Sequence, residues 1–384
     1  MDLFAGCGGL SLGFQNAGIE VVAAYENWGT AARCYSKNFT HPVFQMDLSE
    51  VDIAAKKIIS YKPDIIIGGP PCQDFSFAGK RIEACRASLT GAFAEIVARV
   101  SPKYFVMENV DRARNSNAYA QAREILKNAG YGLTEVVLDA SRCGVPQKRK
   151  RFFCIGSIGK EDGFLIEHIE ATISDKEMTL RDFFSDTLDF ECYYRHPRNY
   201  SRRAIFSIDE PAPTMRGVNR PVPQGYPGHA NDACKLTGEI RALTTLERAL
   251  VQTFPADFKW SGTKTDIEQM IGNAVPVKLA EFVAKALLHH VDECESAGLD
   301  VEGFSKWLHE EQALSMRTEH DTVSRLKRAN TIHKMKASPD AFYLFQLEQE
   351  SDFKELKSAV KSQIKRAINL YAQYLESAIA YCNS

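Results

Sequence analysis

Short apolar runs alternate with amphipathic segments from residue 1 to about residue 155. The apolar runs predict β-strands at 21–24, 64–67, 104–107, 133–138 and 151–155. Hydrophobic positions with helical spacing between these runs predict helices at 31–38, 51–61, 92–100 and 118–129. Such alternation is typical of a mostly parallel sheet with helices on both faces, so we predict a doubly wound α/β fold.

The pattern and the composition change after residue 158. Residues 159–240 are rich in Pro, Gly, Arg and Tyr with few periodic runs, which predicts a smaller, loop-rich domain. Residues 241–291 return to regular patterning, and residues 292–384 are almost entirely helical in pattern. We therefore predict that 1–158 and 241–291 form one α/β domain, followed by a helical C-terminal extension.

The composition is that of a globular protein, with 45% hydrophobic residues, 25% charged residues and a formal net charge of −2. A surface that binds a polyanion would therefore need a local concentration of Lys and Arg. No apolar run approaches the ~18 residues of a membrane span, and no charged-then-apolar leader is present, so we expect no membrane association. Ten cysteines without a CxxC pair indicate reduced thiols and a cytoplasmic location.

A glycine-rich turn, Phe4-Ala5-Gly6-Cys7-Gly8-Gly9, follows a short first strand and precedes a helix. Glycines let the backbone turn tightly and approach a ligand closely. The spacing is not GxGxxG, and the missing third glycine favours a nucleoside without a pyrophosphate. Glu26 and Asp47 follow the next two strands, where an acid suits the hydroxyls of a ribose. Taken singly, each is also compatible with an exposed helix-capping acid.

Cys72 stands directly after a predicted strand, within Gly69-Pro70-Pro71-Cys72-Gln73. Two prolines stiffen the backbone before the thiol and fix its direction. A lone cysteine is usually a small buried hydrophobic residue. A cysteine held at the carboxyl end of a strand beside a ligand pocket can instead act as a thiolate nucleophile, and we predict this role for Cys72.

Over residues 2–160 and 238–290 the sequence resembles the cytosine-5 DNA methyltransferase family, with five motifs in the family's order. These motifs are Phe4-x-Gly6-x-Gly8-Gly9, Pro70-Pro71-Cys72-Gln73, Glu108-Asn109-Val110, Gln147-Lys148-Arg149-Lys150-Arg151 and Gly272-Asn273-Ala274-Val275-Pro276. A further element, Arg241 to Thr244 with Glu247, Gln252, Phe254 and Pro255, is similar to the one that supports the family's recognition domain. The resemblance implies an S-adenosylmethionine-dependent methyltransferase fold with a target-recognition domain at 159–240.

The sequence departs from the family pattern in three places. The first strand has almost no residues before Asp2, which leaves a start further upstream open. Asn27 and then Trp28 follow Glu26, where the family often has an aromatic residue directly after the acid. Arg86-Ala87-Ser88-Leu89 replaces a more usual Arg-Gly.

The resemblance assigns catalytic roles to four residues. Cys72 adds as a thiolate to carbon 6 of cytosine, which makes carbon 5 nucleophilic. Glu108 protonates ring N3, which requires a carboxyl group kept protonated in a dry site. Arg149 and Arg151 are two apart on a strand-like segment and point to the same face. The resemblance implies that Arg151 holds the base or its phosphate and that Arg149 braces the carboxylate, with the reverse assignment left open.

The resemblance also implies S-adenosylmethionine as methyl donor, S-adenosylhomocysteine as product and no metal. Phe4 is expected against the adenine, Glu26 on the ribose and Asp47 on the adenine amino group. The other predicted cofactor contacts are Gly6, Gly8, Gly9, Asn27, Leu48, Pro70, Leu89 and Asn273.

A base inside a duplex cannot reach Cys72, so the target cytosine must be flipped out. The segment 73–88 is expected to close over it, with DNA contacts at Gln73, Ser76, Lys80, Arg81 and Arg86. Six arginines and no lysine occur between residues 195 and 220. Here Pro213-Thr214-Met215 resembles the family's Thr-plus-aliphatic pair. The predicted base contacts beyond it are Arg216, Asn219 and Arg220, and each arginine has phosphate contact as its alternative.

Beyond residue 291 the resemblance ends. An apolar stripe at Leu356, Val360, Ile364 and 370–375 predicts a long amphipathic helix. A basic run is followed by aromatic residues: Arg325, Lys327, Arg328, Lys334, Lys336, Phe342, Tyr343 and Phe345. One hypothesis is a DNA-contacting helical module. The other is a helical bundle that packs on the catalytic domain or mediates self-association.

We predict a bacterial DNA (cytosine-5)-methyltransferase that acts on double-stranded DNA of the nucleoid, either with a cognate restriction endonuclease encoded nearby or alone. The alternatives are a cytosine-5 methyltransferase acting on transfer RNA and a catalytically inactive DNA-binding regulator. The long arginine-rich segment and the absence of a Cys-Phe-Thr tripeptide favour DNA. The presence of Cys72, Glu108, Arg149 and Arg151 argues against an inactive protein.

Overall fold

The computed structural model describes residues 1–71, 89–199, 201–296, 299–312, 314–335, 339 and 341–382. The chain divides into two compact units, a first unit, Met1–Leu287, and a C-terminal unit, Leu288–Ser384. Among the helices of the described ranges, none combines the length and the apolar character that crossing a membrane requires.

A seven-stranded sheet forms the centre of the first unit, in the order β3-β2-β1-β4-β5-β8-β6. Its strands are β1 (Asp2–Leu3), β2 (Ala24–Glu26), β3 (Val43–Gln45), β4 (Ile65–Gly68), β5 (Tyr104–Val110), β6 (Tyr131–Asp139) and β8 (Lys150–Ile158). All neighbouring strands are parallel except those that pair with β8. The predicted α/β fold with a mostly parallel sheet is confirmed.

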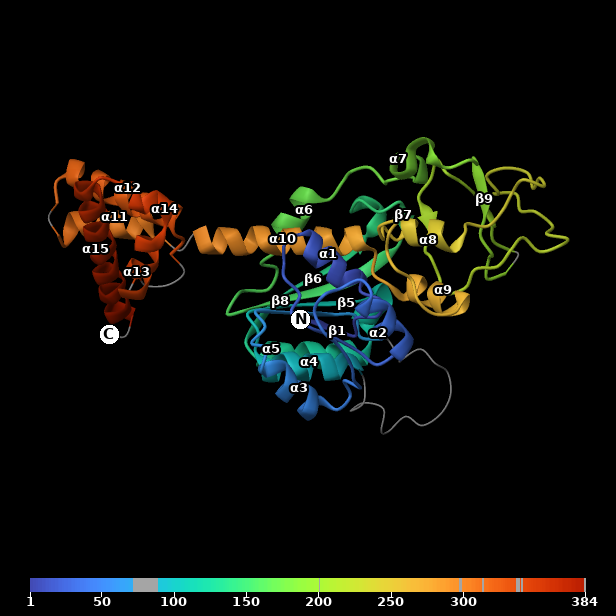
Figure 1. Cartoon of the computed structure of the whole chain (residues 1–384), viewed down its shortest axis with the longest axis horizontal. Coiled ribbons are helices and arrows are strands. Elements are labelled where there is room, and N and C mark those ends of the chain that lie inside the picture. Colours follow the sequence, from blue (N-terminus) through green and yellow to red (C-terminus); the bar gives the residue numbers. More distant parts are fainter. Residues whose placement is uncertain are drawn as a thin grey trace. The chain divides into compact units, whose positions relative to one another are not determined.

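Helices cover both faces of this sheet. Figure 1 shows α3, α4 and α5 on one face and α1 and α10 on the other. Their bounds, with α2 and two 3-10 helices, are α1 (Gly9–Asn16), α2 (Gly29–Ser36), α3 (Val51–Ile59), α4 (Leu89–Val100), η1 (Asp111–Asn115), α5 (Asn117–Asn128), η2 (Ala140–Arg142) and α10 (Val277–Ser296). Helix α1 approaches α10 closely, because a Cβ added to Gly13 would lie 2.4 Å from that of Ala280.

The order of the strands determines where a ligand can bind. From β1 the chain moves outward to β2 and β3 and then returns to β4, on the other side of β1. Where connections leave a parallel sheet in opposite directions, a crevice opens at the carboxyl ends of the strands. The glycine turn after β1 and the Gly69-Pro70-Pro71 segment after β4 both lead into this place.

Residues 159–287 contain short elements: α6 (Ile166–Thr172), α7 (Leu180–Phe184), η3 (Ser185–Thr187), β9 (Cys192–Tyr194), β10 (Ile205–Ser207), β11 (Ala212–Pro213), α8 (Thr245–Val251) and α9 (Lys264–Asn273). Strand β9 pairs with β10, and β11 pairs with β7 (Gln147–Lys148), directly before Arg149. The pattern did not predict α6 or α7, because helices of five to seven residues are too short for a clear periodicity. Two small apolar cores lie here, one around Tyr193 and Phe206 and one around Tyr194 and Tyr226.

The C-terminal unit is helical, as predicted. Its helices are α11 (Val301–Glu310), α12 (Met316–Ile332), α13 (Ala341–Gln349), α14 (Ser351–Lys354) and α15 (Ser358–Cys382). The predicted apolar stripe is confirmed, because Ile364 and Tyr371 of α15 are fully buried in a core with Phe304 and Leu326.

Candidate active site

The turn after β1 requires glycine for two different reasons. Gly6 and Gly8 have φ of 57° and 101°, in the left-handed region. A Cβ on Gly8 would also lie 2.3 Å from the Phe39 ring, and a Cβ on Gly9 would lie 2.3 Å from the carbonyl oxygen of Val275. The turn is therefore packed between α2 and the segment after α9, and its backbone is held open towards the crevice.

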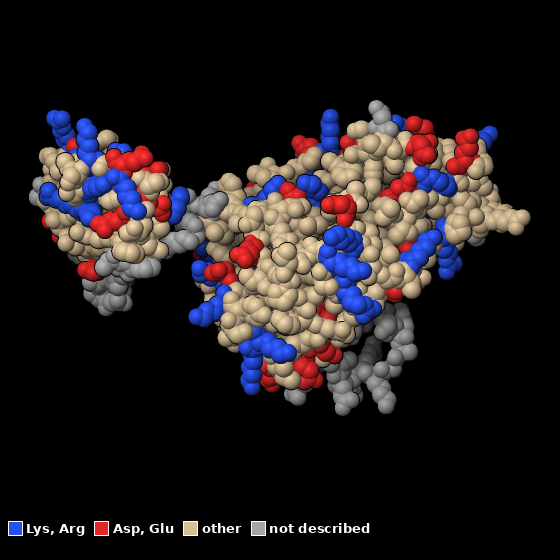
Figure 2. All heavy atoms as spheres, viewed as in Figure 1, with Lys and Arg blue, Asp and Glu red and all other residues tan. Residues whose placement is uncertain are grey.

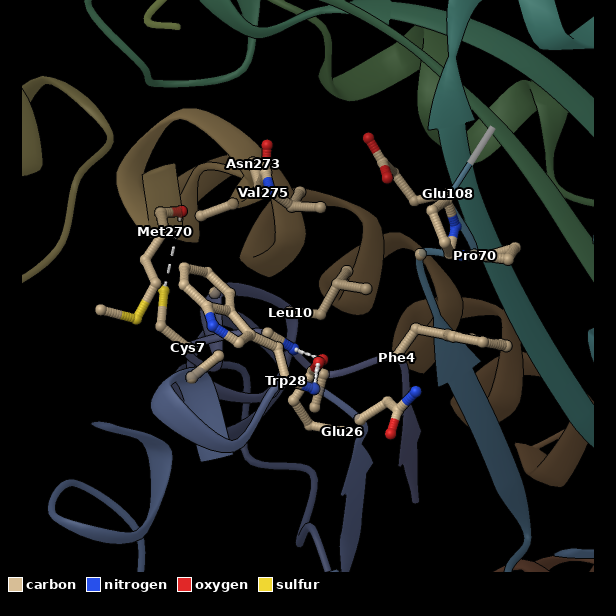
Figure 3. Close-up of a pocket in the computed structure, with 18 of the residues that line it drawn as sticks. Phe4, Cys7, Leu10, Glu26, Trp28, Pro70, Glu108, Met270, Asn273 and Val275 are labelled. Carbon is tan, nitrogen blue, oxygen red and sulfur yellow. Dashed lines mark hydrogen bonds between the residues drawn. The ribbon is translucent and has the colours of Figure 1, made fainter. Parts of the chain in front are cut away.

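Glu26, the last residue of β2, has both carboxylate oxygens fixed by this backbone. Oε2 accepts a hydrogen bond from the Gly6 N–H at 2.7 Å, and Oε1 accepts one from the Trp28 N–H at 2.7 Å (Figure 3). Each oxygen still has a free lone pair for a ligand hydroxyl. Asp47 is exposed, and its Oδ1 accepts from the Ser49 N–H at 2.9 Å, so it caps a turn at the edge of the same crevice.

A cavity of about 720 Å³ occupies the crevice. All but one of the predicted cofactor contacts line it: Phe4, Gly6, Gly9, Glu26, Asn27, Asp47, Leu48, Pro70, Leu89 and Asn273. Gly8 is the exception, because it faces Phe39. The cavity also extends to Glu108, Arg149 and Arg151, so the residues predicted for the cofactor and for catalysis border one space.

The register of β5 and β8 brings Glu108 next to Arg151. Glu108 pairs with Phe153 and Val110 with Arg151, so Glu108 and Arg151 are diagonal neighbours on one face of the sheet. Arg151 Nε lies 2.8 Å from Glu108 Oε1, and both side chains are nearly buried. Burial raises the pKa of Glu108 more than Arg151 and Arg149 lower it. Burial therefore shifts Glu108 towards its protonated form relative to an exposed glutamate.

Asn109 and Gly69 fix the backbone that leads to position 72. Asn109 Nδ2 donates to the Pro70 carbonyl at 3.1 Å from a buried position. A Cβ on Gly69 would lie 3.1 Å from Glu108 Oε2, so the chain passes close to the carboxylate. Asn109 was not among the predicted site residues, although the Glu-Asn-Val motif contains it.

Arg149 does not brace the carboxylate. Its guanidinium donates to three backbone carbonyls, those of Met215 at 3.0 Å, Gly272 at 3.0 Å and Ala274 at 3.1 Å. The ion pair with Glu108 belongs to Arg151 instead. The physical reason is register: position 151 lies within β8 opposite β5, whereas Arg149 lies before β8 and is 1% exposed beneath the segments at 215 and 272–274.

A family model described as C-5 cytosine-specific DNA methylase matches residues 1–289. The chain belongs to this family. The Type II methyltransferase M.HindV of Haemophilus influenzae is 55% identical over 295 residues, which cover 76% of this chain and 97% of that protein. The Type II methyltransferase M.HgiDI of Herpetosiphon aurantiacus is 53% identical, with 76% and 95% covered.

Solved structures support the fold of this methylase. S. pombe Dnmt2 methyltransferase aligns with a TM-score of 0.61 and 20% identity, covering 76% of this chain and 98% of that one. A putative DNA modification methyltransferase encoded within an E. coli prophage aligns with a TM-score of 0.56 and 22% identity, covering 76% and 98%. At these identities the likeness concerns the fold alone.

Six of the predicted site residues lie outside the described residues of the methylase. They are Cys72, Gln73, Ser76, Lys80, Arg81 and Arg86. Their roles stay predictions from the motifs.

Two of the three predicted base contacts, Arg216 and Asn219, border a small hollow in the methylase, together with Tyr194, Arg195, His196 and Arg248. Burial, and after it the charge of Arg216, lowers the pKa of Arg195 to about 10. Burial, and after it the charges of Arg198 and Arg220, lowers the pKa of Arg216 as well. Arg216 donates to the His196 carbonyl. A cluster of like charges is typical of a surface that meets phosphates or guanine edges.

Asn219 and Arg220, the other two predicted base contacts, differ in their surroundings. The Asn219 amide nitrogen donates to the Leu243 carbonyl at 2.8 Å and to Glu268 at 3.2 Å, so this nitrogen is used within the protein. Arg220 is exposed.

An ion pair that the sequence did not indicate holds the segment 216–219. Arg248 of α8 and Glu268 of α9 lie 2.9 Å apart, with each side chain 5% exposed. Arg248 also donates to the carbonyls of Arg216 and, at 3.3 Å, of Val218. Both charges lie on amphipathic helices, where a sequence pattern assigns charged residues to solvent.

Trp28 is a second residue that the prediction missed. It lines the cavity two residues after Glu26 (Figure 3). The predicted cofactor contacts included Asn27 but not Trp28, although the sequence shows this aromatic residue two positions after Glu26.

Proposed function

We propose that this methylase transfers a methyl group from S-adenosylmethionine to carbon 5 of a flipped-out cytosine in a specific duplex DNA sequence. One observation carries the proposal: a single cavity is bordered by the glycine turn with Glu26 and by the Glu108–Arg151 pair. A methyl donor and a pyrimidine can thus be held in one space. The closely similar relatives are named Type II methyltransferases.

The residues around the cavity suit S-adenosylmethionine. A volume of about 720 Å³ is in the usual range of small-molecule sites, about 300–1,000 Å³. Glu26 offers two oriented carboxylate oxygens to the ribose hydroxyls, and Phe4, Leu48 and Leu89 offer apolar surface to the adenine. When bound, this donor supplies an electrophilic methyl group and leaves as S-adenosylhomocysteine.

Glu108 and Cys72 act together on the cytosine ring. The Cys72 thiolate forms a bond from Sγ to C6, and the electron pair of the C5–C6 double bond shifts through the ring towards N3. Glu108 gives its proton to N3, which neutralises the charge that would otherwise build up there. Burial favours the protonated form of Glu108 before this step, and Arg151 stabilises the carboxylate that remains after it. Carbon 5 of the adduct is an enamine carbon, which is nucleophilic.

We infer that the substrate is double-stranded DNA of the nucleoid in the cytoplasm, with a cognate restriction endonuclease as a further partner. The description of the matching family model favours DNA over transfer RNA, and the relatives named as methyltransferases favour an active enzyme over a regulator. The arginine-rich segment around Arg195 and Arg216 would supply the contacts to the duplex.

Expression in a bacterial host that lacks cytosine methylation tests the proposal. Mapping 5-methylcytosine across the host genome should show one methylated sequence motif. The Glu108→Gln variant, expressed to the same level, should reduce methylation strongly, because proton transfer contributes about 10²–10⁴-fold to such rates. A genome without 5-methylcytosine, together with methylated host transfer RNA, would instead support the RNA alternative.

The nucleophile has its own test. Duplex DNA with 5-fluorocytosine in the mapped motif should trap the wild-type protein covalently, because fluorine at carbon 5 cannot leave as a proton does. Cys72→Ser should abolish the trapped species, whereas Cys143→Ser, which alters a buried cysteine outside the cavity, should retain it. Trapping by Cys72→Ser would refute the assignment.

A further inference from the structure

The C-terminal unit is a separate folded body that the methylase family does not account for. The family match ends at residue 289. The unit has its own core, in which Phe304, Leu308, Leu326, Ile364 and Tyr371 are 0–1% exposed. A core of this kind stabilises the helices, but it leaves their outer faces without an assigned role.

The second half of α12 and the first half of α15 lie against the same part of this unit. His333, after α12, contacts Glu350 at 2.8 Å, and Lys365 of α15 pairs with Glu348 of α13. The second half of α12 and the first half of α15 therefore both lie against the α13–α14 region. Away from this region, α11 contacts both helices: the Tyr371 hydroxyl in the second half of α15 accepts from the Asp300 N–H before α11 at 2.8 Å, and Ser305 of α11 donates to Glu319 in the first half of α12. Helices α12 and α15 therefore run in opposite directions.

The two helices lack acidic residues along these halves. Neither 322–335 nor 357–375 contains Asp or Glu. Their exposed positions carry side chains of the types that contact phosphates: Ser324, Lys327, Arg328, Thr331, Lys334, Lys357, Ser358, Ser362, Gln363, Arg366, Asn369 and Gln373. We call these residues the α12–α15 polar face.

Several cations of this face are available for a partner. Arg325 and Lys365 pair with Asp321 and Glu348. In the ranges that the structure describes, Lys327, Arg328 and Arg366 have no acidic partner within ion-pair distance. Figure 2 shows Lys and Arg side chains on the surface of this unit, with Asp and Glu side chains beside several of them. Unpaired cations beside amide and hydroxyl groups are complementary to a chain of phosphates.

We propose that the α12–α15 polar face binds the phosphate backbone of duplex DNA without reading its sequence. This inference rests on the proposed DNA substrate and adds a DNA contact outside the family's catalytic and recognition parts. The acid-free stretch of α15, at 1.5 Å per residue, extends about 28 Å, which is long enough to meet several phosphates. The hypothesis of a DNA-contacting module is thereby narrowed to this face. Tyr343 is excluded from it, because its ring is buried in the core of the unit.

The full-length chain tests the face with two matched double variants. Arg328→Gln/Arg366→Gln removes two charges from the α12–α15 polar face. Lys306→Gln/Arg317→Gln removes two exposed charges from α11 and the start of α12, outside the face. Fluorescence anisotropy with a 30-base-pair duplex of mixed sequence gives the affinity at several salt concentrations.

Log K falls linearly with log salt, and each lost phosphate contact makes this slope less steep by about 0.9. The face variant should therefore make the slope less steep by about 1.8, and its affinity deficit should be about 12-fold larger at 50 mM than at 200 mM salt. The control variant should keep the wild-type slope. Lys327→Gln/Lys357→Gln, a second pair on the same face, should repeat the effect.

Equal slopes for the face and control variants would overturn the proposal. A wild-type dimer that becomes a monomer in the face variant with an unchanged slope, seen by sedimentation, would assign the face to self-association and would overturn it as well. Methyl transfer to the mapped motif is measured in the same preparations. Failure of the proposed function would appear as absent transfer by the wild type, whereas failure of this inference would appear as unchanged slopes beside normal transfer.

Discussion

Neutralising one member of the Arg248–Glu268 pair should leave the other as an uncompensated charge in the protein interior. Arg248→Met removes the guanidinium but keeps a side chain of similar length. Glu268→Gln removes the negative charge and keeps an oxygen that can accept from Thr245, now at 2.7 Å, and from Asn219, at 3.2 Å. The double variant contains no charge at either position. The three variants therefore form a mutant cycle in which only the ion pair is shared.

The structure sets the size of the expected effects. Breaking a buried ion pair by removing one partner costs about 3–5 kcal/mol of unfolding free energy. Arg248→Met also leaves two backbone carbonyls without their donor, at about 1 kcal/mol each. In Arg248→Met, Glu268 still accepts hydrogen bonds from Thr245 and Asn219, which reduces the loss of unfolding free energy. We expect each single variant to lose about 3–4 kcal/mol and the double variant to lose at least about 2 kcal/mol less than their sum.

Urea unfolding followed by tryptophan fluorescence measures these differences. Trp307 lies in the C-terminal unit, so a Trp307→Phe background confines the signal to Trp28 and Trp260 of the first unit. Lys278→Gln is the matched control, because Lys278 is 49% exposed in its pair with Glu281; an exposed pair contributes about 0–1 kcal/mol. The reasoning would be refuted if each single variant lost less than about 1 kcal/mol of unfolding free energy and the two losses added up in the double variant.

Further predictions concern the catalytic and cofactor parts of the site. Methyl transfer should decline on the alkaline side as Glu108 loses its proton, since burial raises its pKa and the protonated form acts; Glu108→Gln should remove that limb from the pH–rate profile, and a profile unchanged in shape would contradict the proton-donor role. Glu26→Gln should weaken S-adenosylmethionine binding about tenfold or more in calorimetry, since hydrogen bonds to a charged group contribute about 1.5–3 kcal/mol, with Gln45→Glu, outside the cavity, as a control for local charge. Gly9→Ala should lower the unfolding temperature, because its methyl group would lie 2.3 Å from the Val275 carbonyl and overpacking costs about 1–3 kcal/mol; Gly91→Ala, with nothing within 4 Å of its Cβ, should not.

The fold and the positions of the motifs followed from local pattern. Apolar runs predicted the buried strands β4, β5, β6 and β8, since each sequence run is long enough to show its character. The carboxyl ends of β2, β4 and β5 then located Glu26, the Pro70-Pro71 segment and Glu108 at one crevice. What the pattern could not supply was register. Which of the two arginines, Arg149 or Arg151, pairs with Glu108 was left open by the pattern and depends on which residue of β8 faces Glu108 across the β5–β8 ladder.

Tertiary packing accounts for the other unpredicted features. Arg248 and Glu268 lie on different helices and 20 positions apart, and only the approach of α8 to α9 buries them. Local sequence therefore gives no sign that these two charges differ from solvated ones. In the same way, Gly217 passes close beside Gly272, because a Cβ added to Gly272 would lie 2.2 Å from the Gly217 nitrogen. Only the folded unit brings these two residues together.

Two buried arginines, Arg149 and Arg248, both donate hydrogen bonds to main-chain carbonyls of residues 215–218. Arg149 binds the carbonyls of Met215, Gly272 and Ala274, so one guanidinium holds both residues 215–218 and the end of α9. Residues 215–218, which contain the predicted base contact Arg216, are the recognition segment. Arg248 binds the carbonyls of Arg216 and Val218 on the same recognition segment. Because these donors hold main chain, the contacts do not depend on the side chains of residues 215–218. Those side chains can therefore change while the main chain of 215–218 stays tied to α8 and to the end of α9.

Arg248→Met separates this positioning role from simple destabilisation. Loss of stability alone lowers the fraction of folded enzyme, which reduces the apparent kcat and leaves both KM values unchanged. Loss of the carbonyl contacts releases 216–218 and should raise the KM for DNA more than the KM for S-adenosylmethionine. Arg248→Lys keeps the charge beside Glu268 but lacks the planar fork, so it should restore stability better than it restores the KM for DNA. If both KM values stay at wild-type levels in Arg248→Met, the pair stabilises the fold without positioning the recognition segment.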